Sequence, residues 1–332
     1  MGLIKRINSK ARVDNTTGFG TISSRYGGRL VNRDGTLNVR KSGINFLEKT
    51  SWYHTLIHLP AWKFYLLIFA TFILINLFFG TIYYVIGTQN LGGLSATTPA
   101  GKYIEAFFFS AQTFTTVGYG RINPTGFLTS SIAAFEAFFG LLNFALATGL
   151  LYARFSRPLA FVKFSDNALI SPFQNGIALM FRMAPFKNNA LTDAEVKITL
   201  FMVVEENEIK MNKFFPLELE YSKVNALSIT WTVVHPIDDK SPLFNFNEED
   251  LRNSKAEIMV YFKAFDETFS NTVVARTSYT FDELVYGAKF VPMYHKSSGG
   301  KTTVIEMDKL SAFETADISY AFSSKSEFAA RQ

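Results

Sequence analysis

The sequence predicts a two-span α-helical membrane module followed by a soluble all-β domain. No charged residue lies between Lys63 and Lys102, and Glu136 is the single charged residue between Arg121 and Arg154. Each of these apolar stretches supplies the roughly 20 residues that a helix needs to cross a bilayer. After Pro158 the chain changes to β-branched and aromatic runs separated by Asn, Asp, Pro and Gly, which is typical of a β-sandwich.

Two predicted segments precede the first span. Residues 1–45 form a cytoplasmic N-terminal segment that is partly flexible. Its first ~30 residues are basic, rich in Gly, Ser and Thr, and without periodicity, so we expect them to be mostly flexible. Leu30–Val39 reads as a short extended stretch with a turn at Asp34-Gly35. Residues 46–60 read as an amphipathic helix that ends at Pro60 and lies on the bilayer surface, a slide helix. A short buried helix of a soluble domain is the alternative.

Residues 61–157 form the predicted membrane domain. The first span, the outer helix, runs from about Trp62 to Gly87, and the second span, the inner helix, runs from about Phe127 to Arg154. Gly101–Thr115 between them reads as a helix too short to cross. Non-helical backbone at membrane depth survives only where it is buried in protein or lines a wet cavity. A re-entrant helix followed by an extended return strand meets that condition.

The return strand is Thr116, Val117, Gly118, Tyr119 and Gly120. Four copies of the string TVGYG around one axis supply the rings of carbonyl oxygens that replace the water of a K⁺ ion. Glycine adopts positive φ without strain, which lets successive carbonyls point the same way. The sequence therefore predicts a tetrameric potassium filter that holds K⁺ through its carbonyls, because one strand alone cannot encircle an ion.

Residues 158–315 form the predicted β-sandwich domain, and residues 316–332 form a C-terminal tail. The strands expected are Ile177–Met183, Val196–Val204, Ser228–His235 and Glu257–Phe265. Lys and Arg outnumber acidic residues up to Lys63, whereas the loop 88–127 holds few charges. By the positive-inside tendency both termini are cytoplasmic in a multi-pass protein of the cell (inner) membrane. We expect no signal peptide, because no apolar stretch lies close to Met1.

Several separate motifs resemble one family in its own order, over roughly residues 30–315. These motifs are NRDGTLNV (Asn32–Val39), WYHTLIHLPAW (Trp52–Trp62), FFFSAQTFTTVGYG (Phe107–Gly120), GLLYARFSRP (Gly149–Pro158), WTVVHPIDDKSPL (Trp231–Leu243), LRNSKAEIMV (Leu251–Val260) and ARTSY with DELVYGAKFVP (Ala275–Pro292). The chain resembles the prokaryotic inward-rectifier potassium channels of the KirBac family. The resemblance implies a homotetramer with a cytoplasmic immunoglobulin-like sandwich that extends the pore, and no organic cofactor.

The resemblance also assigns roles along the inner helix. Tyr152 matches the bulky residue that closes the pore at the helix crossing, although an interfacial anchor is the plainer role for a Tyr there. Gly140 and Gly149 are hinge candidates, with close helix packing as the alternative. Asn143 and Phe144 lie at the position where strong rectifiers of the family carry an acidic residue. Without that charge we expect only weak block by Mg²⁺ or polyamines.

Three further sets of residues complete the predicted sites. Gln112 and Glu136 are expected to support the filter from behind. Gln112 replaces a Glu that pairs with an Arg in many relatives, while Glu105 and Arg121 remain nearby in sequence. The resemblance raises Trp62, Lys63, Arg154 and Arg157 as contacts for anionic phospholipids or phosphoinositide. It places Ser270, Asn271 and Thr272 in a loop that lines the cytoplasmic pore.

Other classes of function find less support in the sequence. A membrane-anchored β-sandwich receptor or adhesion module leaves TVGYG unexplained and requires the β-domain outside the cell, against the charge bias. A two-span pore with another sensing domain needs a βαβ pattern after the second span. No histidine forms a metal-spaced pair with carboxylates, and there is no nucleophile elbow, P-loop or dinucleotide-binding glycine run. We therefore expect neither an enzyme nor a nucleic-acid partner.

Overall fold

The computed structural model describes residues 8, 10–14, 18, 28–43, 45, 51–206 and 209–318. The chain divides into two compact units, Lys41–Arg157 on one side and Met1–Arg40 with Pro158–Gln332 on the other. The expected flexibility of the first residues and the start of the predicted slide helix, residues 46–50, lie outside the described residues. The predicted boundaries of the five segments stay predictions.

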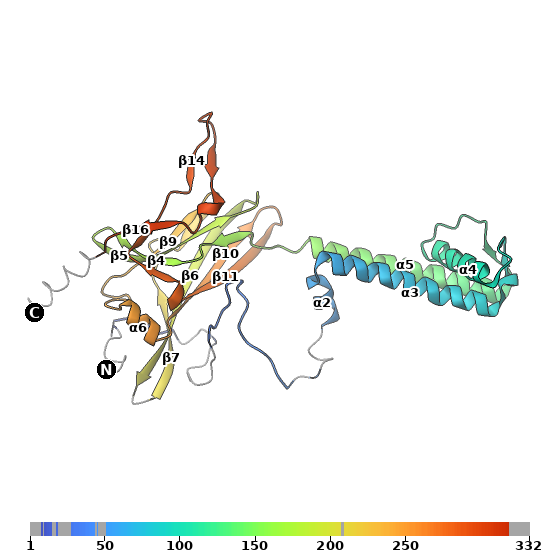
Figure 1. Ribbon diagram of the computed structural model, residues 1–332, viewed down its shortest axis with the longest axis horizontal. Helices are drawn as coiled ribbons and strands as arrows, with labels where there is room; N and C mark the ends of the chain where they lie inside the picture. The colour runs from blue at the N-terminus through green and yellow to red at the C-terminus, as the bar shows by residue number, and fades with distance from the viewer. Residues whose placement is uncertain are drawn as a thin grey trace, which may run out of the picture. The chain divides into compact units, whose positions relative to one another are not determined.

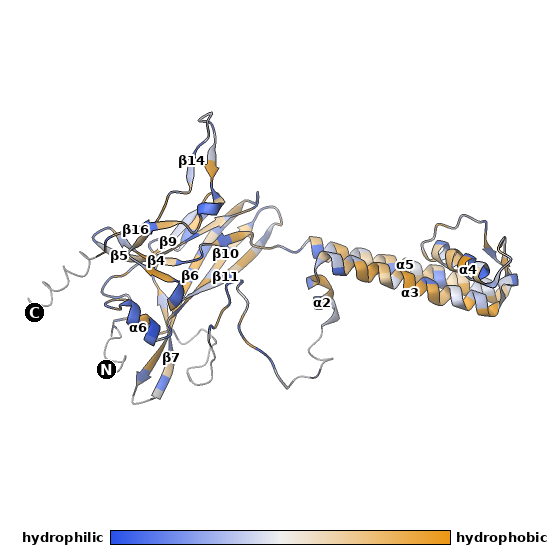
Figure 2. Cartoon of the chain, in the orientation of Figure 1, coloured by the Kyte–Doolittle hydropathy of each residue, from blue (hydrophilic) through white to orange (hydrophobic). Residues whose placement is uncertain are grey.

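The unit Lys41–Arg157 is helical (Figure 1). Its helices are α2 (Trp52–His58), α3 (Ala61–Gly87), α4 (Pro99–Phe114) and α5 (Phe127–Phe155), with a short 3₁₀ turn η3 (Thr88–Asn90) and the paired strands β1 (Leu91–Gly92) and β2 (Asn123–Pro124). Helices α3 and α5 are long and apolar enough to cross a membrane, as their colouring in Figure 2 illustrates. The short helix α4 packs against both of them.

Local sequence explains where these helices begin and end. The Thr98 hydroxyl accepts a hydrogen bond from the Gly101 N–H (3.2 Å), and Pro99 opens α4, where its missing N–H costs nothing. Helix α3 is followed by a turn at Gly87, whose φ of 116° favours glycine. The two spans therefore end at residues that the sequence analysis placed within one position, at Gly87 and Phe155.

The other unit is a β-sandwich of two five-stranded sheets. One sheet has the order β11-β10-β6-β7 with β8 also paired to β6, and the other has the order β12-β4-β5-β3 with β9 also paired to β5. The bounds are β3 (Val162–Phe164), β4 (Ala168–Phe173), β5 (Gly176–Pro185), β6 (Leu191–Glu206), β7 (Ile209–Leu217), β8 (Lys223–Leu227), β9 (Trp231–Pro236), β10 (Glu257–Asp266), β11 (Asn271–Thr280) and β12 (Leu284–Tyr286). Side chains from both sheets, among them Phe181, Leu200 and Phe262, form one buried core.

Smaller elements decorate the sandwich. Helix α6 (Glu248–Asn253) opens with a capping box between Asn247 and Asp250, and the 3₁₀ turns η4 (Phe281–Glu283) and η5 (Met307–Lys309) follow later. The short strands β13 (Ala288–Phe290) and β16 (Phe313–Thr315) pair, as do β14 (Tyr294–Lys296) and β15 (Thr303–Ile305). The predicted strand Ser228–His235 begins later, at Trp231, because residues 228–230 form a bend.

The stretch 29–38 forms a small hairpin on the sandwich. An antiparallel bridge joins Val31 to Leu37, and the turn at Asp34-Gly35 lies where the sequence predicted it. The carboxylate of the buried Glu257 accepts hydrogen bonds from the N–H groups of Leu30 (2.7 Å) and Val31 (3.0 Å). This hairpin is therefore held to the β-domain through its backbone.

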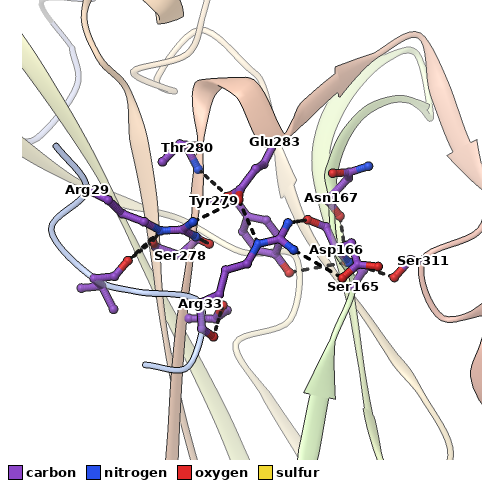
Figure 3. A network of polar contacts seen from close by, with 12 residues as sticks. Arg29, Arg33, Ser165, Asp166, Asn167, Ser278, Tyr279, Thr280, Glu283 and Ser311 are labelled. Atoms are coloured by element: carbon purple, nitrogen blue, oxygen red, sulfur yellow. Dashed lines mark hydrogen bonds and ion pairs between the residues drawn. The ribbon is translucent and has the colours of Figure 1, made fainter. Parts of the chain in front are cut away.

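Two arginines of the hairpin add charged contacts (Figure 3). Glu283 accepts from Arg29 (3.0 Å) and from Arg33 (2.8 Å). Arg33 also lies 3.4 Å from the carboxylate of Asp166, and Arg29 donates to the Ser278 hydroxyl at 2.8 Å. The segment that leads toward α2 is thus tied to strands β10 and β11 and to the β3–β4 connection.

Candidate functional site

The backbone of Thr116–Gly120 alternates in handedness. Thr116, Gly118 and Gly120 have positive φ values of 56°, 53° and 82°, whereas Val117 and Tyr119 do not. Positive φ is unusual for a β-branched residue, so Thr116 is held there by its surroundings. Alternation of this kind turns successive peptide planes the same way, which is what a row of parallel carbonyls requires.

The N–H groups of residues 116–118 face helix α4. Val117 donates to the Gln112 carbonyl at 3.0 Å, Gly118 reaches the same carbonyl at 3.4 Å, and Thr116 donates to the Thr113 carbonyl at 3.0 Å. Within the described part of the chain, no hydrogen bond is made to the carbonyl oxygens of residues 116–119. These oxygens are therefore available to an ion on the side away from α4.

Gln112 contributes its backbone to this arrangement. Its carbonyl anchors two filter amides, whereas its side chain makes no hydrogen bond to the described residues. Filter support from Gln112 stays a prediction. The contacts with Val117 and Gly118 come from its carbonyl oxygen, a main-chain atom that any residue supplies.

A buried polar cluster joins helices α3, α4 and α5. Tyr83 of α3 donates to Glu136 of α5 (2.6 Å), and Ser110 of α4 donates to the other oxygen of the same carboxyl group. The Ser110 hydroxyl also lies 3.0 Å from the amide oxygen of Asn76 on α3. All four side chains are almost completely buried. Because each helix supplies a partner, the cluster fixes the position of α4 between α3 and α5.

A second cluster lies just beyond the filter. Both terminal nitrogens of Arg121 contact one oxygen of Glu105, at 3.1 and 3.0 Å, and one of them also lies 2.7 Å from the Ser95 hydroxyl. Glu105 accepts in addition from the N–H groups of Ser95 (3.0 Å) and Ala96 (3.1 Å). The residue after the filter is thereby connected to α4 and to the loop before it.

The predicted cavity residues lie together below the filter. Thr116, Gly140, Asn143 and Phe144 line one hollow of about 440 Å³, together with apolar residues of α3 and α4. Phe144 is 71% exposed in the single chain. The hydroxyl of Thr116 makes no hydrogen bond to the described residues.

The two glycines of α5 differ sharply in their surroundings. A Cβ atom added to Gly140 would lie 2.0 Å from the carbonyl oxygen of Phe114, the last residue of α4. A Cβ atom at Gly149 would meet nothing within 4 Å. Gly140 is therefore a point of close helix approach. Tyr152, the predicted gate, lies on the last turns of α5 and is 73% exposed in the single chain.

Of the four predicted lipid contacts, Arg154 is the most constrained. Its guanidinium lies over the ring of Phe64 (5.2 Å) and within 3.5 Å of the Ile57 carbonyl of α2. The Lys63 ammonium lies 5.4 Å from the centre of the Trp62 ring, and Trp62 and Arg157 are exposed.

The predicted cytoplasmic loop Ser270–Thr272 belongs to the tip of the β10–β11 hairpin. Ser270 has a φ of 46°, in a loop without glycine. The buried Asp266 accepts from the Thr268 and Phe269 N–H groups at 2.9 and 3.3 Å, which shapes this loop.

Several of these residues were not singled out in the sequence. Asn76 is a polar amide inside an apolar span, which is a usable signal, because such groups need a partner in the membrane. Tyr83 and Ser110 carry no comparable signal, since hydroxyl groups are common in such helices, and Ser95 is one of several hydroxyl residues in the loop before α4. Their roles follow from the packing of three helices that lie far apart in the chain.

Family models match both parts of the chain. A model described as "Ion channel" matches residues 66–157, and one described as "Inward rectifier potassium channel C-terminal domain" matches residues 162–330. The two matches cover the helical module with its filter and the β-sandwich, in that order.

Curated relatives agree with these matches. The chain is 34% identical over 278 residues to the inward rectifier potassium channel Kirbac3.1 of Paramagnetospirillum magnetotacticum, which covers 82% of this chain and 92% of the relative. It is 28% identical to the inward rectifier potassium channel irk-1 of Caenorhabditis elegans, over 82% of this chain and 54% of the relative. It is 27% identical to the G protein-activated inward rectifier potassium channel 2 of Pongo abelii, over 91% of this chain and 75% of the relative.

Proposed function

Because this chain belongs to the inward rectifier potassium channel family, we propose that four copies form a K⁺-selective pore with Thr116–Gly120 as its filter. The family consists of membrane channels and not of enzymes. The pore conducts K⁺ passively down its electrochemical gradient. Filter carbonyls replace the hydration water of the ion, so K⁺ itself is the only bound group that the function needs.

The observation that carries this proposal is the backbone of the filter. Positive φ at alternate residues, amides that face α4 and carbonyls without hydrogen bonds together leave one row of oxygens for an ion. A chance TVGYG string in an ordinary loop does not require this combination. Carbonyl groups without a hydrogen bond are costly at membrane depth unless an ion or water contacts them.

A flux assay tests the proposal. The purified chain is placed in liposomes, and K⁺ flux is compared with Na⁺ flux and with flux under Ba²⁺ block. We expect K⁺ to pass in preference to Na⁺, and Gly118→Ala to abolish conduction or selectivity, because alanine resists the φ of 53°. Gly176→Ala in the β-domain is the matched control, since the new methyl group meets nothing at either position but Gly176 has no positive φ. Equal K⁺ and Na⁺ flux in the parent chain, or an unchanged Gly118→Ala variant, would contradict it.

The clusters around α4 support the filter in this proposal. Glu136 holds α4 through Ser110 and holds α3 through Tyr83. Helix α4 therefore keeps its place behind the filter. The Gln112 carbonyl orients the amides of Val117 and Gly118. Neither group contacts the ion; both position the backbone that does.

Weak rectification follows from the same cavity. Asn143 and Phe144 line the hollow with Thr116, and neither carries a negative charge to attract Mg²⁺ or polyamines. We expect weak block by spermine applied from the cytoplasmic side, and much stronger block in Phe144→Asp, which adds one carboxylate per subunit. Steep block of the parent chain would contradict this prediction and would mean that acidic residues elsewhere in the pore bind the blocker.

Gating and lipid sensing belong to the other end of α5. We propose that four Tyr152 side chains close the pore where the inner helices cross, and that Trp62, Lys63, Arg154 and Arg157 bind anionic phospholipid or phosphoinositide. Tyr152→Ala is expected to raise basal K⁺ flux. Flux in vesicles with and without anionic lipid tests the second part, and Arg154→Gln is expected to reduce the difference between the two.

The β-sandwich extends the pore into the cytoplasm in this proposal, with Ser270, Asn271 and Thr272 lining a second constriction. Both termini then face the cytoplasm, in the cell membrane. Protease added to sealed vesicles of known orientation tests this topology. Membership of a channel family leaves no support for the receptor or adhesion alternative.

A further inference from the structure

Two histidines on α2 form a pair that the pore does not use. His54 and His58 are one helical turn apart, so their side chains lie on the same face of α2 (Trp52–His58). Their rings stack with centres 3.8 Å apart and planes 25° apart. Both residues are exposed in the chain. Neither ring forms an ion pair with a carboxylate of the described residues.

The hydrogen bond of His58 determines which of its nitrogens is free. Its Nδ1 lies 2.6 Å from the His54 carbonyl oxygen. A carbonyl oxygen only accepts, so Nδ1 carries the proton, and Nε2 of the neutral ring keeps its lone pair. Metal-binding histidines commonly have this arrangement, with the second ring N–H donated to a carbonyl. The His54 ring makes no hydrogen bond to the described residues, so either of its nitrogens can act as a ligand.

We propose that His54 and His58 form a two-imidazole site for a borderline transition-metal ion, Ni²⁺, Cu²⁺ or Zn²⁺. Imidazole suits these ions, and a metal–nitrogen bond is about 2.0–2.1 Å long. Lone pairs of the ring nitrogens lie in the ring planes, so the stacked rings do not yet face a common ion. Rotation of the exposed His54 ring turns one of its nitrogens toward the ion held by Nε2 of His58, whose Nδ1 stays on the His54 carbonyl. No cluster of three or more His, Cys, Asp or Glu side chains exists in the described chain. Water completes the coordination.

The site lies on the turn of α2 that contacts the inner helix. Ile57, between the two histidines, presents its carbonyl to Arg154 of α5 at 3.5 Å. An ion bound by both histidines ties together the two ends of this turn. On the proposed function, an ion that stiffens this turn acts on the segment that meets Arg154, two residues after the proposed gate Tyr152, and so changes conduction.

Direct binding is measured on the untagged full-length chain in detergent. Titration calorimetry with Ni²⁺ and electron paramagnetic resonance with Cu²⁺ report affinity and the number of imidazole ligands. We expect two imidazole nitrogens on Cu²⁺ in the parent chain, one in His54→Gln and in His58→Gln, and affinity reduced by at least about tenfold. His295→Gln, an exposed histidine of the β-domain, is the matched control and is expected to bind as the parent does.

The proposal is wrong if the parent chain shows no saturable Ni²⁺ binding, or if either α2 variant binds as tightly as His295→Gln. Gel filtration of each variant verifies the assembly. The binding measurement does not depend on the proposed channel function, so the two can fail separately. For the effect on conduction, Ni²⁺ is added to the K⁺ flux assay. We expect Ni²⁺ to change K⁺ flux in the parent chain and in His295→Gln, and to leave it unchanged in both α2 variants. An equal change of flux in all four chains would refute the coupling.

Discussion

Gly140→Ala tests whether this glycine is a hinge or a point of close packing. The new methyl group would lie 2.0 Å from the Phe114 carbonyl oxygen, whereas an ordinary contact of carbon with oxygen is about 3.3–3.6 Å. The end of α4 and α5 would therefore have to separate by roughly 1.3 Å. Overpacking of this kind costs about 1–3 kcal/mol, against a gain of about 0.5–1 kcal/mol from replacing a helical glycine.

Gly149→Ala is the matched control, because it brings the same helical gain with no contact within 4 Å. We expect thermal unfolding of the purified chain in detergent to occur at lower temperature for Gly140→Ala and at an equal or higher temperature for Gly149→Ala. Displacement of Phe114 also moves Thr115 and Thr116, so Na⁺ flux relative to K⁺ flux should rise in the first variant alone.

The two readings of Gly140 give different results. A hinge without close packing predicts lower K⁺ flux with unchanged unfolding temperature and unchanged selectivity. The reasoning from packing is refuted if the two alanine variants unfold at the same temperature and discriminate Na⁺ equally well.

Three other predictions concern polar groups. Glu257→Gln removes one of the two carboxylate oxygens that accept from the Leu30 and Val31 N–H groups. We expect the free energy of unfolding to fall by about 1–3 kcal/mol and trypsin to cleave faster within residues 28–43; unchanged cleavage would contradict this prediction. Arg121→Gln and Glu105→Gln each remove an ion pair whose arginine is 58% exposed. Arg121→Gln should therefore cost at most about 1 kcal/mol. Glu105→Gln should cost about 1–3 kcal/mol, because its side chain is only 15% exposed and an amide NH₂ replaces an oxygen that accepts from Ser95 as well as Arg121. The double variant should be no less stable than Glu105→Gln; additive losses would show that the pair is not coupled. Burial lowers the pKa of His235 below its ordinary 6.5. The unfolded chain then binds the proton more readily, and the stability of the β-domain is full above about pH 6.5 and falls as the pH drops through the lowered pKa; unfolding temperatures from pH 7.5 to 5.5 should vary less in His235→Asn.

Comparison of the predicted and observed elements shows where local pattern is informative. The apolar spans, the short helix before TVGYG and the turn at Asp34-Gly35 were all found close to their predicted positions. Strong hydropathy contrast and turn residues are local signals, so each of these elements can be predicted from its own segment of sequence. The strand predicted from Ser228 began at Trp231 instead, because strand ends are set by pairing with β5 and not by composition alone.

The sequence by itself determined that this chain carries two apolar spans around the string TVGYG, followed by an all-β domain, and its motifs were sufficient to indicate the family. Those features depend on composition, periodicity and short strings, which exist before folding. Tertiary structure decided which polar groups meet. The Glu136 cluster, the Glu105–Arg121 pair and the contact of Gly140 with Phe114 each join residues at least 16 positions apart. The packing of α4 against α3 and α5 makes the first and the third of these contacts, and the return of the chain after residues 116–120 makes the second. Contacts of this kind depend on the tertiary fold, so no local sequence pattern predicts them.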